Sequence, residues 1–314
     1  MKNEISIAMN TKLKNDSLFN VRFRQNGIVT FLLFLSVCSG GLYAQTDKNS
    51  GTGLQQKGFA VYIFTDMEGC SSLTNRDQLL SEQGPLRMAE DMNACIAACF
   101  ESGASKVIVK DGHGGGLNVN PQLIDKRAIL IQGATPGERY KGGIDSCAAL
   151  ILLGYHGMAM TPNAIMAHSY SSASVQSMFL NGKPVGEIGV DAAIAAEHKV
   201  PVVLVTGDDK TCREAQEWIP GVITCQVKKA TSTLSGICLP LEKSHRLIAR
   251  KTKQALARRN SIPLIRVKYP VTMRWDYIPA GTPRVYALDF KPFSDPKSKE
   301  LSSNSVEKLL VGKN

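Results

Sequence analysis

Acidic and imidazole side chains follow several apolar segments of this chain, each typical of a buried strand. In chain order these side chains are Asp66, Glu68, His113 and His156. In open α/β sheets, sites form outside the carboxyl ends of the strands, where the loops converge. A lone aspartate there is commonly a helix cap and a lone histidine a structural residue. Two carboxylates and two imidazoles together, however, suit zinc or a similar divalent ion.

The spacing of Asp66 and Glu68 favours more than one metal ion. Residues i and i+2 of a strand point the same way, so both carboxylates can reach one metal cluster. With His113, His156 and one further carboxylate, the set has five ligands. Five is more than a single tetrahedral catalytic zinc uses, and it fits two ions that share a bridging carboxylate.

The segments that must position these side chains alternate between strands and helices. Strands are expected at residues 59–65, 107–110, 148–153, 201–206, 262–268 and 284–290, and a hairpin at 175–185 around Asn181-Gly182. Helices are expected at residues 85–102, 188–198 and 241–259, with another opening after 207. This alternation implies βαβ crossovers. The predicted fold class is therefore α/β, with a mostly parallel sheet flanked by helices and a smaller basic α+β C-terminal part.

Composition and pattern divide the chain into five segments. They are a signal peptide (1–44), a flexible lead-in (45–58), a metal-binding α/β catalytic domain (59–206), a C-terminal α/β part (207–290) and a polar tail (291–314). The sequence contains no GxGxxG, GxxxxGK[ST] or GxSxG motif. Dinucleotide binding, P-loop nucleotide binding and a serine-hydrolase elbow are therefore not indicated.

The first 44 residues have the order of a secretory signal peptide. Basic residues within 1–26 precede an apolar run at 28–37, and small residues precede Gln45. Cleavage after Ala44 is expected, and with it a periplasmic or secreted protein. Lipidation at Cys38 is the alternative, disfavoured because Val37 stands where a small residue is wanted. No other run approaches the length of a membrane-spanning helix, so no stable membrane insertion is expected.

The net charge of +10 is unevenly distributed. Residues 206–314 carry twenty Lys and Arg against ten Asp and Glu, whereas residues 45–205 carry twelve against fifteen. A basic end could bind nucleic acid, anionic lipid or an acidic neighbouring subunit. No RNA-binding aromatic signature accompanies the charge, so a solvated surface is the preferred interpretation and no nucleic-acid partner is expected.

Five motifs, taken in order, resemble those of the DppA-type D-aminopeptidases, a family of binuclear zinc peptidases. They are FTDMEG (64–69), KDGH (110–113), LGYH (153–156), MAHS (166–169) and PVGEIG (184–189). The segment PVVLVTGDD (201–209) is also similar to that family, and the resemblance covers about residues 58–290. Each tetrapeptide alone is a weak signal, and the combination is specific.

The resemblance implies a site with two zinc ions per chain. Its ligands would be Asp66, Glu68, His113, His156 and Glu187, with Asp66 bridging the ions. His168 matches a histidine that the family assigns to catalysis rather than to metal binding. The family also implies ring-shaped homo-oligomers, notably decamers, that remove N-terminal D-residues such as D-alanine from short peptides.

Several of these residues have a simpler interpretation from sequence alone. Glu187 sits beside the first turn of a helix, where acids favour the positive end of the dipole, and only the motif match makes it a ligand. His198 and His245 lie on expected helices without a partner motif and are taken as surface residues. Cys70 stands where the family usually has an aliphatic residue, and packing is preferred over a role as ligand or nucleophile. The seven cysteines after residue 44 are expected to be mostly buried free thiols.

The sequence therefore predicts an exported zinc aminopeptidase acting on short peptides. Another metal-dependent amidase or hydrolase is the alternative, and few positive groups near the ligands in sequence weigh against a phosphoesterase. A non-catalytic metal-binding protein of the envelope is a third hypothesis, which the presence of all five candidate ligands and His168 disfavours. The polar stretch 291–314 departs from the longer apolar helix with which the family usually ends.

Overall fold

The computed structural model describes residues 58–135, 137–282 and 292–311. The expected signal peptide, and the strand expected at 284–290, lie outside these residues. These described residues belong to one compact unit. No helix within the described residues combines the length and apolarity needed to cross a membrane.

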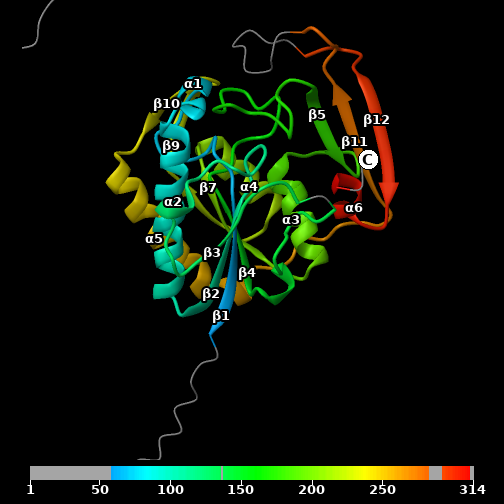
Figure 1. The fold of residues 1–314 in the computed structure, drawn as a ribbon. Helices are drawn as coiled ribbons and strands as arrows, with labels where there is room; N and C mark the ends of the chain where they lie inside the picture. Colours follow the sequence, from blue (N-terminus) through cyan, green and yellow to red (C-terminus); the bar gives the residue numbers. More distant parts are fainter. Residues whose placement is uncertain (1–57, 136, 283–291, 312–314) are drawn as a thin grey trace, which may run out of the picture. The chain divides into compact units, whose positions relative to one another are not determined.

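A six-stranded parallel sheet forms the centre of the fold, as Figure 1 shows. Its strands in spatial order are β3 (Ile129–Ile131), β2 (Ala104–Asp111), β1 (Phe59–Thr65), β4 (Ala149–Leu153), β7 (Val202–Gly207) and β8 (Ile223–Gln226). Every neighbouring pair is parallel. Strand order runs outward in both directions from β1 and β4, so these two strands flank the topological switch point, where α/β sheets place their ligands.

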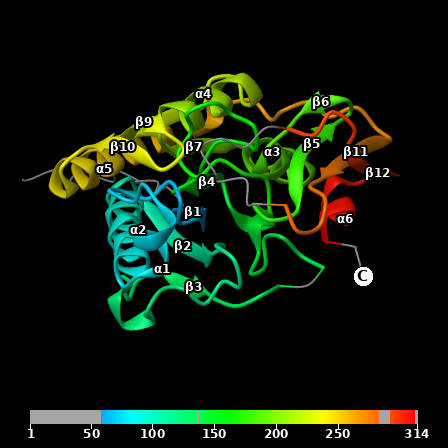
Figure 2. The same cartoon turned by 90° about the horizontal axis from the view of Figure 1, so that it is seen from above.

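Helices cover both faces of this sheet, which confirms the predicted fold class (Figure 2). On one face, α2 (Gln83–Glu101) and α5 (Leu241–Ala257) pack against each other and against the sheet. The other face buries α3 (Glu187–Glu197) together with Ala215 of α4 (Asp209–Trp218). The short helix α1 (Arg76–Leu80) precedes α2. The near-continuous burial of β1, β4 and β7 is the reason these strands read as unbroken apolar runs.

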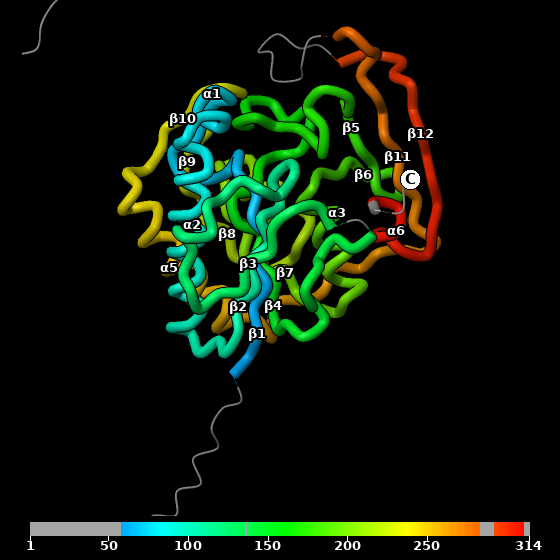
Figure 3. The backbone as a smooth tube through the Cα atoms, viewed as in Figure 1, coloured from blue at the N-terminus to red at the C-terminus, as the bar shows by residue number. Residues whose placement is uncertain are grey.

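A second, antiparallel sheet lies beyond α3 and joins segments distant in sequence. Its order is β12 (Lys297–Ser303), β11 (Val271–Tyr277), β5 (Val175–Leu180) and β6 (Lys183–Pro184). Figure 3 shows the green β5 beside the orange β11. The predicted hairpin is confirmed, because Asn181 and Gly182 both have positive φ, 48° and 79°, in the turn between β5 and β6. A separate hairpin consists of β9 (Lys228–Ser232) and β10 (Ser235–Cys238).

One expectation about the C-terminal part was wrong. Residues 262–268 form no strand and instead follow a 3₁₀ turn at Arg259–Ser261 in irregular conformation. The polar tail contains β12 and the helix α6 (Val306–Val311). Strand β12 pairs along its whole length with β11 through backbone hydrogen bonds, which need no apolar pattern. Among residues 306–310 of helix α6, Val306 and Leu309 are buried, which is too short a pattern to read from sequence.

Candidate metal centre

The loops that leave β1 and β4 are held together backbone to backbone at the switch point. Asp66 N–H donates to Leu153 O at 2.8 Å, and Gly69 N–H donates to Gly154 O at the same distance. A Cβ on Gly69 would lie 1.8 Å from Tyr155 O, so a side chain cannot be accommodated there without moving the loops apart. The two loops that carry Asp66, Glu68 and His156 are thereby fixed relative to each other.

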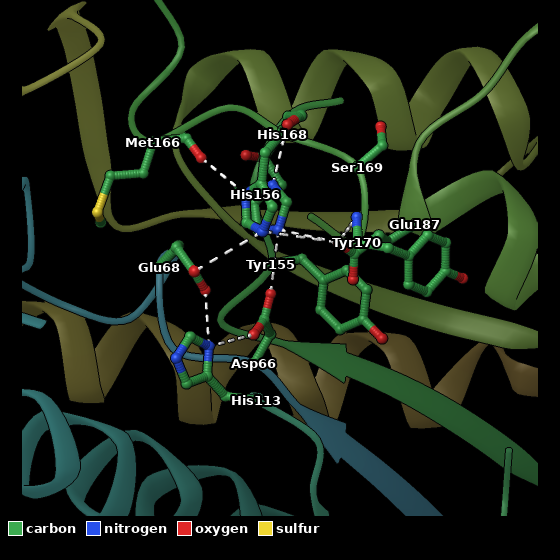
Figure 4. A network of polar contacts seen from close by, with 12 residues as sticks. Asp66, Glu68, His113, Tyr155, His156, Met166, His168, Ser169, Tyr170 and Glu187 are labelled. Atoms are coloured by element: carbon green, nitrogen blue, oxygen red, sulfur yellow. Dashed lines mark hydrogen bonds and ion pairs between the residues drawn. The ribbon is translucent and has the colours of Figure 1, made fainter. Parts of the chain in front are cut away.

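The structure brings six predicted site residues into one cluster, shown in Figure 4. They are Asp66, Glu68, His113, His156, His168 and Glu187. Asp66 and Glu68 follow β1, His113 follows β2, His156 follows β4, and Glu187 is the first residue of α3. His168 lies on the loop between β4 and β5. Asp66, Glu68 and His156 form one group with ligand atoms within 4.8 Å of one another, and His156, His168 and Glu187 form another.

The two oxygens of Asp66 divide the cluster into halves. His113 Nδ1 lies 3.0 Å from Asp66 Oδ1 and 3.0 Å from Glu68 Oε2. On the other side, His156 Nε2 lies 3.3 Å from Asp66 Oδ2 and 3.4 Å from Glu187 Oε1. Each half thus has one imidazole nitrogen and two carboxylates, with Asp66 common to both. This arrangement suits a carboxylate that bridges two ions.

Hydrogen bonds to main-chain carbonyls orient two of the imidazoles. His156 Nδ1 lies 2.9 Å from Gly157 O, and His168 Nδ1 lies 2.9 Å from Met166 O. A carbonyl oxygen only accepts hydrogen bonds, so Nδ1 carries the proton in both rings. When the ring is neutral, Nε2 therefore presents a lone pair to the carboxylates. A histidine held in this way has the orientation of a metal ligand or a general base.

Two buried polar atoms of the cluster lack hydrogen-bond partners, and both fit a bound cation. They are Asp66 Oδ2 and His156 Nε2, which lie 3.3 Å apart. In the tautomer set by Gly157 O, both atoms present lone pairs to each other. Unsatisfied buried acceptors in such proximity are costly unless a proton or a cation lies between them. A donor set of carboxylate oxygens and imidazole nitrogens is the chemistry that zinc prefers.

Charge in the cluster shifts the pKa values in the direction expected of a cation site. Burial disfavours charge on His113, but Glu68 and Asp66 outweigh it and raise its pKa to about 11. Burial also opposes charge on His156, yet Asp66 and Glu187 raise its pKa well above the usual range. Burial alone would raise the pKa of Asp66, but His113 and His156 hold it well below its usual range. Protons and metal ions therefore compete for the same positions.

Glu187 points into the cluster instead of capping its own helix. The N-cap of α3 is Gly186, which offers no side-chain cap, and Glu187 Oε1 accepts the Tyr170 N–H at 2.8 Å. The same oxygen lies 3.9 Å from His168 Nε2. Glu187 therefore ties the His168 loop to the half of the site that contains His156.

A cavity of about 430 Å³ opens onto the cluster. Asp66, Glu68, His113, His168 and Glu187 line it, together with Arg76 and Arg139. Few positive groups lie near the candidate ligands in sequence, which weighed against a phosphoesterase. In the folded chain, however, these two arginines line the same cavity as the ligands. The sequence did not indicate that Arg139 belongs to the site, since its partner Asp191 lies 52 residues away and no motif includes it.

The histidines and cysteines that the sequence analysis left out of the site have defined contacts in the structure. His198 and His245 are not unpartnered surface residues: His198 Nδ1 lies 2.7 Å from Asp145, and His245 Nε2 lies 3.3 Å from Asp91. Cys70 is buried and its thiol donates to Asp66 O at 3.2 Å, which agrees with a packing role. All seven cysteines of the described residues are free, and six of them are buried, as expected.

Comparisons with known proteins find similarity to D-aminopeptidases. A family model described as D-aminopeptidase matches residues 59–288. A D-aminopeptidase of Bacillus subtilis (strain 168) is 37% identical over 218 residues, which are 67% of this chain and 79% of the relative. The solved structure of the Zn-dependent D-aminopeptidase DppA from Bacillus subtilis, described as a self-compartmentalizing protease, matches with a TM-score of 0.71 at 29% identity. That match covers 81% of this chain and 96% of the relative.

Proposed function

The chain belongs to the D-aminopeptidase family, and on that premise we propose that it is an exported zinc-dependent aminopeptidase. Its substrates would be short peptides, with N-terminal D-residues such as D-alanine. The observation that carries the proposal is the division of the site around Asp66, whose two oxygens face the imidazoles of His113 and His156. A shared carboxylate between two nitrogen ligands supports a site for two zinc ions per chain.

The residues of the chain have distinct roles in this proposal. Asp66, Glu68, His113, His156 and Glu187 would hold zinc, which when bound polarises a scissile carbonyl and lowers the pKa of a water. His168 would handle protons, because Met166 O keeps the proton of its neutral ring on Nδ1 and leaves Nε2 toward the site. His168 Nε2 lies 4.0 Å from Glu68 Oε1 and 3.9 Å from Glu187 Oε1, so the imidazole stands beside two of the carboxylates that would hold zinc.

The activity is tested with purified protein of measured zinc content and two chromogenic substrates, D-Ala-p-nitroanilide and L-Ala-p-nitroanilide. The proposal expects about two zinc ions per chain, release of p-nitroaniline, and a higher kcat/KM for the D-substrate. Removal of zinc with a chelator should abolish the activity and zinc addition should restore it. Absence of turnover of both anilides and of the dipeptide D-Ala-D-Ala by the zinc-loaded protein would contradict the proposed function. Preference for the L-substrate would contradict the assignment to D-residues.

Export is proposed on the order of basic residues, apolar run and small residues within 1–44. In the envelope, the source of the substrates would be the stem peptides of the cell wall. N-terminal sequencing of envelope material should begin near Gln45. Recovery of intact protein in the cytoplasm would overturn export, and a lipid on Cys38 would replace cleavage after Ala44 with lipoprotein anchoring.

A homo-oligomeric ring is proposed from the relative described as a self-compartmentalizing protease. A ring of identical subunits would place the active sites in an enclosed space and admit only short peptides. Light scattering coupled to size-exclusion chromatography measures the mass directly. A monomer of about 30 kDa with full activity would contradict the ring, while the family suggests ten subunits.

A further inference from the structure

A second cavity, of about 290 Å³, adjoins the cavity at the metal centre. Both are lined by Gly112, Gly114, Arg139 and Tyr170, so these residues lie at the junction of the two cavities. The second cavity also has main-chain walls at Gly115, Gly116 and Gly133. Cavities of this size hold small ligands. A substrate whose reacting bond lies at the metal centre can therefore extend past Arg139.

Arg139 is held rigidly at this junction by its neighbours. Its Nε and Nη2 groups donate to the two carboxylate oxygens of Asp191 at 2.8 and 2.9 Å. Its guanidinium lies over the Phe64 ring, 4.2 Å from the centroid, and 5.6 Å from the centroid of Tyr170. Asp191 is fully buried and also accepts the Tyr155 hydroxyl at 2.6 Å. The guanidinium thus has a fixed position before any substrate arrives.

One nitrogen of this guanidinium remains available for a ligand. Within the described part of the chain, Nε and Nη2 of Arg139 are bonded to Asp191, and no hydrogen-bond partner is found for Nη1. Tyr170 also lines both cavities, and its buried hydroxyl likewise has no hydrogen-bond partner among the described residues. A charged N–H donor at a cavity wall is well suited to a carboxylate.

Helix α3 connects the metal cluster to the carboxylate that holds Arg139. Glu187, which faces the metal cluster, and Asp191, which holds Arg139, are four residues apart on this helix. Residues i and i+4 lie on one face, about 6 Å apart along the axis. Two peptide residues in extended form span at most about 7 Å. A dipeptide bound by its N-terminal part at the metals would therefore have its carboxylate near Arg139.

The other cations of the two cavities are less suited to this role. The ammonium of Lys110 lines the second cavity but donates to Gly133 O. Arg76 lines the metal cavity from α1, and among the described residues it has no ion pair that would orient it. A planar guanidinium that is already fixed loses less entropy on binding a carboxylate than a mobile side chain does.

From this geometry we propose that Arg139 is a specificity-determining residue that binds the free C-terminal carboxylate of short peptide substrates. The enzyme would then favour di- and tripeptides with a free C-terminus over the same peptides with a C-terminal amide. The inference rests on the proposed aminopeptidase function and adds the class of peptide to it. A charge-assisted hydrogen bond of this kind corresponds to a preference of about 10- to 100-fold in kcat/KM.

The test compares D-Ala-D-Ala with its C-terminal amide, which share the same reacting bond, on the zinc-loaded protein. The wild type should favour the free acid by at least about tenfold in kcat/KM. D-Ala-p-nitroanilide, which has no carboxylate, keeps the two hypotheses distinct. If neither the anilide nor either peptide is hydrolysed, the aminopeptidase function itself fails. If the anilide and both peptides are hydrolysed and the acid has no advantage, the role of Arg139 is wrong.

Variants assign the preference to one guanidinium. In Arg139→Met and in Arg139→Lys, the kcat/KM for the free acid divided by that for the amide should fall toward one. The lysine variant keeps a positive charge beside Asp191, so it serves if the methionine variant folds poorly. Arg76→Met, which removes the other guanidinium of the metal cavity, is the matched control and should keep the wild-type ratio. If the preference for the free acid is lost in Arg76→Met and kept in the Arg139 variants, the inference is overturned. Efficient turnover of p-nitrophenyl phosphate would also overturn it, since the cations would then serve a phosphate.

Discussion

The imidazole rings of His156 and His168 are stacked, with centroids 4.0 Å apart and planes 12° apart (Figure 4). Both rings donate from Nδ1 to a main-chain carbonyl, so their Nε2 atoms point to the same group of carboxylates. Glu187 Oε1 lies 3.4 Å from one Nε2 and 3.9 Å from the other. His168 therefore lies beside the metal cluster in a position from which it can either transfer protons or act as a ligand.

The substitution His168→Ala distinguishes these two roles. If His168 transfers protons or stabilises the oxyanion, the variant should keep its zinc and its fold and lose about 10²–10⁴-fold in kcat. The KM should change little, because the group acts mainly in the transition state. Zinc analysis, a melting curve and steady-state kinetics on the same preparation decide the question. Full activity would remove the catalytic role, and loss of zinc would make His168 a ligand.

The substitution Asp66→Ala tests the bridging carboxylate. Since both oxygens of Asp66 face an imidazole, its loss leaves both halves of the site short of a ligand. Bound zinc should fall from near two per chain toward zero. Asp125→Ala, which removes a carboxylate paired with Arg127 outside the cluster, should keep the wild-type zinc content. An unchanged zinc content in the Asp66 variant would contradict the binuclear site.

Lys228 supports the loop that carries Glu68, and its removal should weaken both the fold and the site. Its buried ammonium donates to Glu68 O at 2.6 Å, to Cys70 O at 2.9 Å and to Leu73 O. In Lys228→Met these carbonyls lose their donor, so the free energy of unfolding should fall by roughly 2–4 kcal/mol. Denaturant titration measures this loss, and chelator competition should show weaker zinc binding. The neighbouring Lys229 is exposed, and Lys229→Met should resemble the wild type in both measurements.

His198 should make the stability of the fold depend on pH. Burial disfavours its charge, but Asp145 and Glu307, at 2.7 and 3.2 Å, raise its pKa above the usual value. A raised pKa in the folded state gives stability that is fully present below about pH 6.5 and is lost as the pH rises through the folded pKa. The melting temperature of His198→Gln should therefore lie about 2–4 °C below that of the wild type at acid pH, with a smaller difference at alkaline pH. In Asp145→Asn this pH dependence should be reduced. A difference that grows with rising pH would contradict the assignment.

Much of the fold could be predicted because its signals are local. The buried strands β1, β4 and β7 are unbroken apolar runs, and Gly103 follows α2 with a φ of 89°, as a helix-ending glycine should. Strand β12 could not be predicted, since its residues are polar and its order comes from pairing with β11, which lies more than twenty residues earlier. Residues 262–268 show the converse error, because an apolar pattern without a partner strand forms no sheet.

The sequence by itself determined the residues that gather in the candidate metal centre. Asp66, Glu68 and His156 directly follow strands whose apolar runs mark their ends, and parallel strands place their carboxyl ends at one edge. Only the tertiary structure decided how Asp66 divides the cluster, and which cations surround it. The bidentate pair of Arg139 and Asp191 joins residues 52 positions apart. Lys228 reaches its carbonyl acceptors across 155 or more positions. Such contacts depend on how strands and helices pack, and the pattern of neighbouring residues in the sequence does not predict which distant residues meet.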